Sequence, residues 1–188
     1  MRGRILSKIA LAVGILLFIA AAAGFIFLKW REENSAMRGE ELAARIETAL
    51  PEKIAGVAEQ RTDNDMPVME LDGTDFVGML ELADRHYKQP VAAQWDSSLF
   101  AYRPARFTGS VYDGSIIIGG DFDFAGEIDA GEPLTFTDMT GRVFGYTVVR
   151  ISHAQSADAQ TLASKGGALT LFTKKDGAYL IVACEFAE

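Results

Sequence analysis

The distribution of apolar and polar residues changes twice along the chain, and each pattern predicts a different element. Residues 9–28 are 20 consecutive positions without a charged residue, an amide or a proline. From residue 35 to about 59, apolar residues recur at spacings of four and three, as in an amphipathic helix: Leu42, Ile46, Leu50, Ile54 and Val57. Beyond Pro67, short β-prone runs alternate with Gly, Asp and Pro. A helix, a second helix and a β-rich domain are therefore expected in that order.

The first pattern predicts a transmembrane helix, because about 20 apolar residues span the hydrocarbon core of a bilayer. The alternative is a signal peptide cleaved at the small residues 20–23. Retention is favoured because the apolar run continues to Leu28, and because Lys29, Trp30 and Arg31 form an interfacial anchor. We expect residues 1–8 to be a cytoplasmic tail and residues 9–30 a transmembrane anchor.

The basic residues around this segment predict its orientation. Arg2, Arg4 and Lys8 precede the apolar run, whereas only Lys29 and Arg31 follow it closely. Basic residues are enriched on the cytoplasmic side of a membrane helix. The chain is therefore expected to be a single-pass protein of the cell membrane, with a cytoplasmic N-terminus and an extracellular C-terminal domain.

Residues 31–66 are expected to form the amphipathic helix and a linker. Pro51 interrupts the apolar stripe and predicts either a kink or a division into two shorter helices. Residues 59–66 (EQRTDNDM) are polar and are typical of a linker. The apolar stripe predicts that the helix packs against another part of the molecule.

Residues 67–188 are expected to form a mostly β domain with short helices. Eight strands are predicted, at residues 76–82, 91–93, 106–108, 115–118, 134–137, 143–151, 169–173 and 179–186. Residues 138–141 (DMTG) and 174–177 (KKDG) predict hairpin turns, and residues 157–164 a short helix. Eight short strands favour an eight-stranded β-barrel, because closure removes exposed strand edges.

Composition narrows the classes of function. The chain has 188 residues, 49% of them hydrophobic, and a formal net charge of −8. Such a charge disfavours contact with phosphates, so no nucleic-acid partner is expected. One cysteine, Cys184, and two histidines, His86 and His153, exclude an internal disulfide and a Cys/His zinc cluster. No cofactor is expected.

An ordered series of strings resembles a sortase, most closely the class B and class D type of Gram-positive bacteria. The strings are FVGMLEL (76–82), FTGSVYDG (107–114), SIIIG (115–119), GEPLTFT (131–137), DMTGRVFGYTVV (138–149), LTLFT (169–173) and LIVACE (180–185). The resemblance implies a cysteine transpeptidase, in which a thiolate attacks a sorting-signal peptide and the acyl group passes to a cell-wall or pilin amine. It implies three catalytic side chains: a cysteine nucleophile, a histidine acid/base and an arginine that stabilises the oxyanion.

All three positions carry other residues in this chain. Lys174 follows LTLFT, where the resemblance places the cysteine. Gly120 follows the string ending in Gly119, where it places the histidine. Tyr179 begins the last strand, where it places the arginine. The resemblance therefore implies a pseudo-sortase without the catalytic triad.

The remaining candidates are poor replacements by position. Cys184 lies in the alternating run LIVAC and is expected to be a small buried residue. His86 and His153 are expected to be solvated loop residues. Lys174 adjoins Lys175 and Asp176 in a turn, where an amine stays hydrated and charged, so a nucleophilic role is not expected.

The acidic segment 121–132 follows Gly120 and partly matches a calcium-binding loop. Its candidate ligands are Asp121, Asp123, Asp129 and Glu132, with Gly126 at the sixth position. Ala125 at the fifth position offers no side-chain oxygen, and a strand precedes the segment instead of a helix. The segment is also shorter than in sortases, so the small helix that borders their groove is expected to be missing. An acidic, solvated turn is the favoured interpretation.

Three hypotheses for function follow. The first is a membrane-anchored, catalytically inactive pseudo-sortase that binds a surface protein or peptide segment and acts as a binding or assembly module at the cell surface. The second is an active sortase-type transpeptidase or hydrolase with relocated catalytic groups. The third is a calcium-binding structural surface domain that uses residues 121–132.

Overall fold

The computed structural model describes residues 39, 41–55, 66–96 and 103–187, which lie in one compact unit, Gly39–Glu188. The predicted tail at 1–8 and the predicted anchor at 9–30 lie outside the described residues. Among the residues that are described, no helix is both long and apolar enough to span a membrane.

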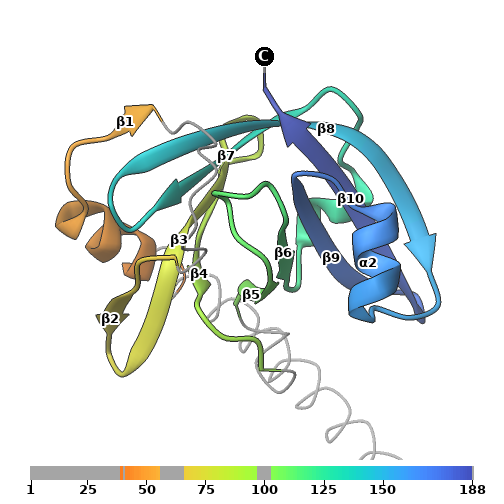
Figure 1. Cartoon of the computed structure of the whole chain (residues 1–188), viewed down its shortest axis with the longest axis horizontal. Helices are drawn as coiled ribbons and strands as arrows, with labels where there is room; N and C mark the ends of the chain where they lie inside the picture. Colours follow the sequence, from red (N-terminus) through yellow and green to blue (C-terminus); the bar gives the residue numbers. More distant parts are fainter. Residues whose placement is uncertain (1–38, 40, 56–65, 97–102, 188) are drawn as a thin grey trace, which may run out of the picture. The chain divides into compact units, whose positions relative to one another are not determined.

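Eight strands close into a barrel, as the sequence predicts (Figure 1). Around the barrel they are β3 (Thr74–Leu82), β4 (Tyr87–Ala92), β5 (Ala105–Thr108), β6 (Ile116–Gly119), β9 (Leu169–Lys175), β10 (Ala178–Phe186), β8 (Arg142–Ala154) and β7 (Pro133–Asp138). β7 pairs with both β8 and β3, which completes the circle. All eight predicted strands correspond to barrel strands, although β4 begins four residues before its predicted start.

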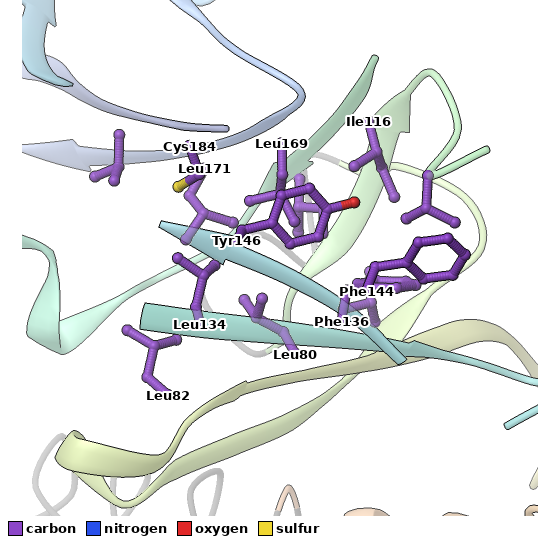
Figure 2. Close-up of a cluster of buried hydrophobic side chains, with 14 of the residues drawn as sticks. Leu80, Leu82, Ile116, Leu134, Phe136, Phe144, Tyr146, Leu169, Leu171 and Cys184 are labelled. Carbon is purple, nitrogen blue, oxygen red and sulfur yellow. The ribbon is translucent and has the colours of Figure 1, made fainter. Parts of the chain in front are cut away.

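The barrel interior is lined by residues that alternate along each strand. On β9, Leu169 and Leu171 face inward, whereas Phe172 belongs to a separate cluster on the outside. Figure 2 shows part of this interior, where side chains from β3, β6, β7, β8, β9 and β10 meet. Each of the eight strands pairs with a neighbour on both sides. Barrel closure therefore leaves no unpaired strand edge and protects the apolar interior from water.

Both predicted hairpin turns are present, and their residues explain them. Between β7 and β8, Asp138 Oδ1 accepts hydrogen bonds from the backbone N–H groups of Thr140 (2.8 Å) and Arg142 (3.0 Å). Between β9 and β10, Asp176 and Gly177 have φ values of 51° and 84°, the left-handed conformation that a two-residue turn requires. These two turns fix the registers β7–β8 and β9–β10.

The amphipathic helix ends earlier than predicted. Gly39 and residues 41–49 are helical, and Pro51 lies in an extended segment that leads to β1 (Ile54–Ala55), which pairs parallel with β8. Pro51 therefore follows the end of the helix, and the prediction of a kink or of a second helix here was wrong for Ile54, which lies in a strand. Val57 and residues 59–65 of the predicted linker lie outside the described residues.

The helix packs on the outside of β3, which confirms that its apolar stripe has a partner. Ile46 is fully buried against Phe76 and Met79. Lys88 on β4 forms an ion pair with Glu47 at 2.6 Å, and this contact lowers the pKa of Glu47. The same face includes the short strand β2 (Met69–Leu71), which the sequence did not predict. Met66, predicted as linker, is buried in the barrel core.

The predicted short helix is α2 (Ala159–Lys165), between β8 and β9. Asp158 caps its N-terminus by accepting the Thr161 N–H at 2.8 Å, and hydrogen bonds from Ser156 and Thr161 lower the pKa of Asp158 to about 2. Arg150 donates to the carbonyl of Lys165 at the other end (2.7 Å). Leu162 holds the helix on the outer face of the barrel, beside β9 and β10 (Figure 1).

Candidate functional site

The three substituted positions of the resemblance meet at one end of neighbouring strands. Lys174 and Tyr179 are directly opposite each other in the β9–β10 ladder. Gly119, the last residue of β6, is opposite Phe172 on β9, and the Gly120 N–H donates to the Phe172 carbonyl at 3.2 Å. The sequence named these three positions separately, and the tertiary structure brings them together.

The backbone at Gly120 has little room for a side chain. A Cβ atom at this position would lie 3.1 Å from Pro104 Cα and 3.3 Å from the Phe122 ring. Both distances are tighter than ordinary van der Waals contact, so a larger residue would require its neighbours to move. Pro104 and Phe122 therefore occupy the space next to Gly120, where the resemblance places a histidine.

Lys174 and Tyr179 differ in exposure. Lys174 is exposed and forms no ion pair with any described residue. Tyr179 is partly buried, and its ring centroid lies 6.4 Å from that of Phe172. An exposed amine lacks the desolvated pocket that activates a nucleophilic lysine.

An aromatic cluster covers the outer face beside these positions. Trp95 and Phe107 approach Phe172 with centroid separations of 5.3 and 5.5 Å, and Trp95 lies 5.6 Å from Phe107. We call Trp95, Phe107, Phe172 and Tyr179 the aromatic cluster. Trp95, Phe107 and Phe172 were not predicted as site residues. No periodicity could have found it, because Trp95 lies in the connection between β4 and β5 and Phe172 lies on β9.

Cys184 is buried in the barrel interior, as the sequence predicts. The residue is 0% exposed, and its neighbours in the ladders are Val148 on β8 and Leu169 on β9 (Figure 2). Burial, followed by the nearby Glu185 charge, raises the pKa of the Cys184 thiol to about 12. A thiol in this environment remains protonated at neutral pH and inaccessible, so it does not have the properties of a nucleophile.

Neither histidine pairs directly with a substituted position, although His153 lies on β8 next to Ala154, the ladder partner of Tyr179. His86 is exposed and follows a short 3-10 helix, η1 (Ala83–Arg85), with a φ of 52°. His153 is exposed near the end of β8, opposite Leu180 on β10. His153 was expected in a loop and instead lies within a strand, because β8 continues to Ala154. On β8, the ladder partner of Cys184 is Val148, which lies five residues before His153.

The acidic segment 121–132 is held by an arginine. Arg85 donates from Nε to Glu132 Oε2 at 2.7 Å and from Nη2 to Glu132 Oε1 at 2.6 Å. It also donates to the Glu127 carbonyl. These contacts raise the pKa of Arg85 and lower that of Glu132.

This arrangement bears on the candidate calcium ligands. Glu132, which would supply the bidentate ligand at the twelfth position, already forms a bidentate pair with Arg85. Asp121 and Asp129 are exposed, and nothing is described of the Asp123 side chain. Within the described residues, no group of three or more His, Cys, Asp or Glu side chains could hold a metal ion. Calcium binding at this loop stays a prediction.

The same segment packs into the core of the barrel. Phe122, Phe124 and Ile128 are buried in the core, and the Phe124 ring lies 4.7 Å from Tyr87 in an edge-on contact. A 3-10 turn, η2 (Asp123–Gly126), provides the bend. The segment is therefore a packed part of the domain, in contrast to the solvated turn that the sequence suggested.

Comparison with solved structures identifies the architecture. Sortase A from Corynebacterium diphtheriae superimposes with a TM-score of 0.53 at 15% identity, over 61% of this chain and 62% of that one. A sortase D transpeptidase from Clostridium perfringens gives 0.51 at 13% identity, over 61% of this chain and 80% of the other. Sortase C1 from Streptococcus suis gives 0.51 at 16% identity, over 60% and 73%.

The barrel has the sortase fold. This confirms the fold that the ordered strings implied, and the chain spans 62% of the length of the Corynebacterium diphtheriae structure. No protein-family model and no curated protein sequence matches the chain. At these identities the comparison establishes the sortase fold, and the chemistry has to be argued from the residues of this chain.

Proposed function

We propose that this protein is a membrane-anchored domain of the cell surface that uses a sortase barrel to bind or assemble a surface protein or peptide segment, without transpeptidase activity. The observation that carries the proposal is the meeting of Lys174, Gly120 and Tyr179 at one end of β6, β9 and β10. These are the positions at which the resemblance places the cysteine, the histidine and the arginine.

Acyl exchange by a sortase mechanism requires a thiolate, a proton carrier and a fixed positive charge near the reacting carbonyl. The site offers an exposed amine, a glycine backbone and a phenol ring instead. The chain's thiol lies in the barrel interior with a pKa raised to about 12. The resemblance to sortases therefore lies in the residues that pack the barrel, whereas the three positions of the catalytic side chains carry other residues.

Peptide binding does not depend on the replaced groups. An extended peptide is held by backbone hydrogen bonds and by pockets for alternate side chains, and neither requires a nucleophile. On the outer face of the barrel, the partly exposed ring of Tyr179 lies opposite the exposed amine of Lys174 and packs against a buried apolar cluster. This supports a role in recognition.

The test is a cleavage assay with the full chain in detergent micelles and a panel of fluorogenic sorting-signal peptides, with an active sortase as the positive control. We expect no cleavage by the wild type and none by the Lys174→Ala variant. A thiol-reactive probe applied to the native protein should leave Cys184 unlabelled. The Lys174→Cys variant is the matched control, because its new thiol lies at an exposed position and should be labelled.

Two results would refute the proposal. The first is cleavage of any sorting-signal peptide by the wild type that Lys174→Ala abolishes. The second is rapid labelling of Cys184 in the folded wild type, which would revive an enzyme with relocated catalytic groups.

Membrane anchoring through residues 9–30 is part of the proposal and rests on the sequence. We expect the full chain to remain in the membrane fraction after alkaline extraction and its C-terminal domain to be cleaved by external protease. Lysines at the helix centre are costly in a bilayer, by about 2.5–3.5 kcal/mol each. The double variant Leu17→Lys/Ile19→Lys should therefore leave the membrane, whereas Leu17→Ala/Ile19→Ala should stay.

A further inference from the structure

The four methionines of the described residues differ in exposure. Met66, Met79 and Met139 are buried, with exposed fractions of 6%, 2% and 7%, whereas Met69 is only partly buried. Met69 lies on β2, which forms one end of the strand order and pairs with β3 in the described sheet. An oxidant dissolved in water therefore reaches the thioether of Met69 before it reaches the other three.

Met69 belongs to the contact between the amphipathic helix and the barrel. It lies directly opposite Phe76 in the β2–β3 ladder, so the two side chains share one face of the sheet. Met69 packs against the buried apolar cluster that joins the helix to this face. We call this cluster the helix cluster; its buried members are Ala43, Ile46, Phe76, Met79 and Met139.

The attachment of the helix depends on this cluster. A helix of a folded protein is held mainly by the packing of its apolar face, and Ala43 and Ile46 place that face in the helix cluster. The ion pairs of Arg45 and Glu47 join partly exposed side chains and add little. Among the described residues, the helix cluster shares no member with the barrel interior. Its packing can therefore weaken while the barrel stays folded.

We propose that Met69 is an oxidation site, and that its conversion to methionine sulfoxide by a peroxide loosens the amphipathic helix from the barrel. The sulfur forms a bond to one oxygen of hydrogen peroxide, the O–O bond breaks, and the second oxygen leaves with both protons as water. The sulfur is oxidised by two electrons and the peroxide is reduced.

The product changes the chemistry of the contact. The thioether of Met69 is apolar and suits its place beside Phe76, whereas a sulfoxide is polar and loses stability in an apolar environment without a hydrogen-bond donor. Methionine sulfoxide reductases restore the thioether, so the change is reversible. The inference concerns the face under the helix and does not depend on the proposed function.

The experiment treats the full chain in lipid nanodiscs with hydrogen peroxide and follows each methionine by peptide mass spectrometry. Met69 should gain an oxygen about tenfold faster than Met79 or Met139, because the rate follows exposure. Hydrogen exchange of the same samples should rise about tenfold in β2 and in residues 41–49 and stay unchanged in β9 and β10. Treatment with methionine sulfoxide reductases should reverse the rise.

Matched variants separate oxidation of Met69 from other effects. Met69→Leu keeps an apolar side chain of similar volume without sulfur, so peroxide should no longer change exchange in β2 or residues 41–49. Met139→Leu changes another methionine of the helix cluster and should respond as the wild type does. Met69→Gln places a polar group at the same position and should loosen the helix without any oxidant.

A thiol at position 43 reports on the helix directly. Ala43 is 4% exposed in the helix cluster, so Ala43→Cys should react slowly with a thiol probe and about tenfold faster when combined with Met69→Gln. Combination with Met69→Leu should leave the rate unchanged. Cys184, which is 0% exposed in the barrel interior, should stay unlabelled in all of these proteins and shows that the barrel remains folded.

Three results overturn the inference. The first is oxidation of Met79 or Met139 as fast as that of Met69. The second is unchanged exchange in β2 and residues 41–49 after oxidation of Met69, or unchanged labelling at position 43 in Met69→Gln. The third is a response to peroxide that persists in Met69→Leu. None of these results bears on the cleavage assay, and cleavage of a sorting-signal peptide would leave the oxidation site unaffected.

Discussion

The barrel interior and the outer face of β6, β9 and β10 are two sides of the same strands, and they are specified in different ways. The interior is a continuous apolar cluster that buries the chain's cysteine. The outer face is a smaller cluster, assembled from strands, from α2 and from the β4–β5 connection. On β9, Leu171 belongs to the barrel interior, whereas its neighbour Phe172 belongs to the outer cluster.

The difference shows what a sortase barrel needs in order to fold. Its interior depends on apolar volume at alternate positions, and that volume is supplied by strand residues such as Leu169 and Leu171. The three positions at the strand ends differ in packing: Lys174 is exposed, Tyr179 is partly buried and Gly120 is buried. The side chain at position 174 is therefore free to change chemistry while the fold persists.

The largest expected effect is in the interior. Phe136 on β7 is 0% exposed, so Phe136→Ala should lower the free energy of unfolding by about 3–5 kcal/mol. Val149 on β8 is 49% exposed, and Val149→Ala should change it by less than about 0.5 kcal/mol. Urea unfolding of the full chain, followed by circular dichroism, measures both. Similar values for the two variants would show that the interior is not tightly packed.

The thiol gives the next largest effect. Cys184→Ser places a hydroxyl in an apolar environment and should cost about 1–3 kcal/mol, whereas Cys184→Ala should cost less. The same urea experiment compares the two. A serine variant as stable as the wild type would mean that water or a polar partner reaches this position.

The thiol also predicts a dependence on pH. Its pKa is raised from 9.0 to about 12 by burial, so the folded state favours the neutral form. Its contribution to stability is complete below about pH 9 and is lost as the pH rises towards 12. The stability difference between the wild type and Cys184→Ala should therefore decline over that range and remain constant from pH 6 to 8.

Tyr146 predicts a gain in stability. Its side chain is buried in the interior (Figure 2), and its hydroxyl has no hydrogen-bond partner among the described residues. Burial, followed by the proximity of Cys184, raises the pKa of Tyr146. Tyr146→Phe should raise the free energy of unfolding by about 1 kcal/mol, because it removes an unsatisfied polar atom. A loss of stability would indicate that an ordered water satisfies the hydroxyl.

The smallest expected effect is on the acidic segment 121–132. Glu132→Gln weakens the pair with Arg85 and should lower the thermal midpoint slightly at pH 7. Because Arg85 lowers the pKa of Glu132 below 4.5, the contribution of this pair is present above that pH and is lost as the pH falls. The wild type and the variant should therefore converge in acid.

The same melts test calcium. With Arg85 already paired to Glu132, we expect equal midpoints in calcium and in chelator. A calcium-dependent rise in the wild type that is absent in Glu132→Gln would favour the calcium-binding hypothesis instead.

Local patterns were sufficient for most of the fold. The alternation of apolar residues and the Gly, Asp and Pro positions located all eight barrel strands, and KKDG fixed the turn that places Lys174 opposite Tyr179. The strands β1 and β2 were missed because two or three residues are too few to show a period. β4 was predicted to begin late because Lys88, Gln89 and Pro90 at its start resemble a loop.

The site was harder to predict, because its contacts join distant parts of the chain. Trp95 contacts Phe172, and Arg85 binds Glu132. Both pairs are far apart in the sequence, so no local sequence pattern predicts them. The acidic segment was predicted to be solvated because of its many charged residues. The burial of Phe122 and Phe124 could not be predicted, because it depends on their contact with Tyr87, which is distant in the sequence.

By itself, the amino-acid sequence determined that the domain is a mostly β barrel and that its interior is apolar, and it named Lys174, Gly120 and Tyr179 as the residues at the positions where the resemblance places catalytic side chains. These properties depend on residue type and on spacing within single strands. Only the tertiary structure decided that Lys174, Gly120 and Tyr179 converge, that Cys184 faces the closed interior, and that Trp95 covers the neighbouring face. The physical reason is that barrel closure determines which strands become neighbours and which side chains lie on the same face of the barrel wall. Closure depends on contacts between residues that are distant in the sequence.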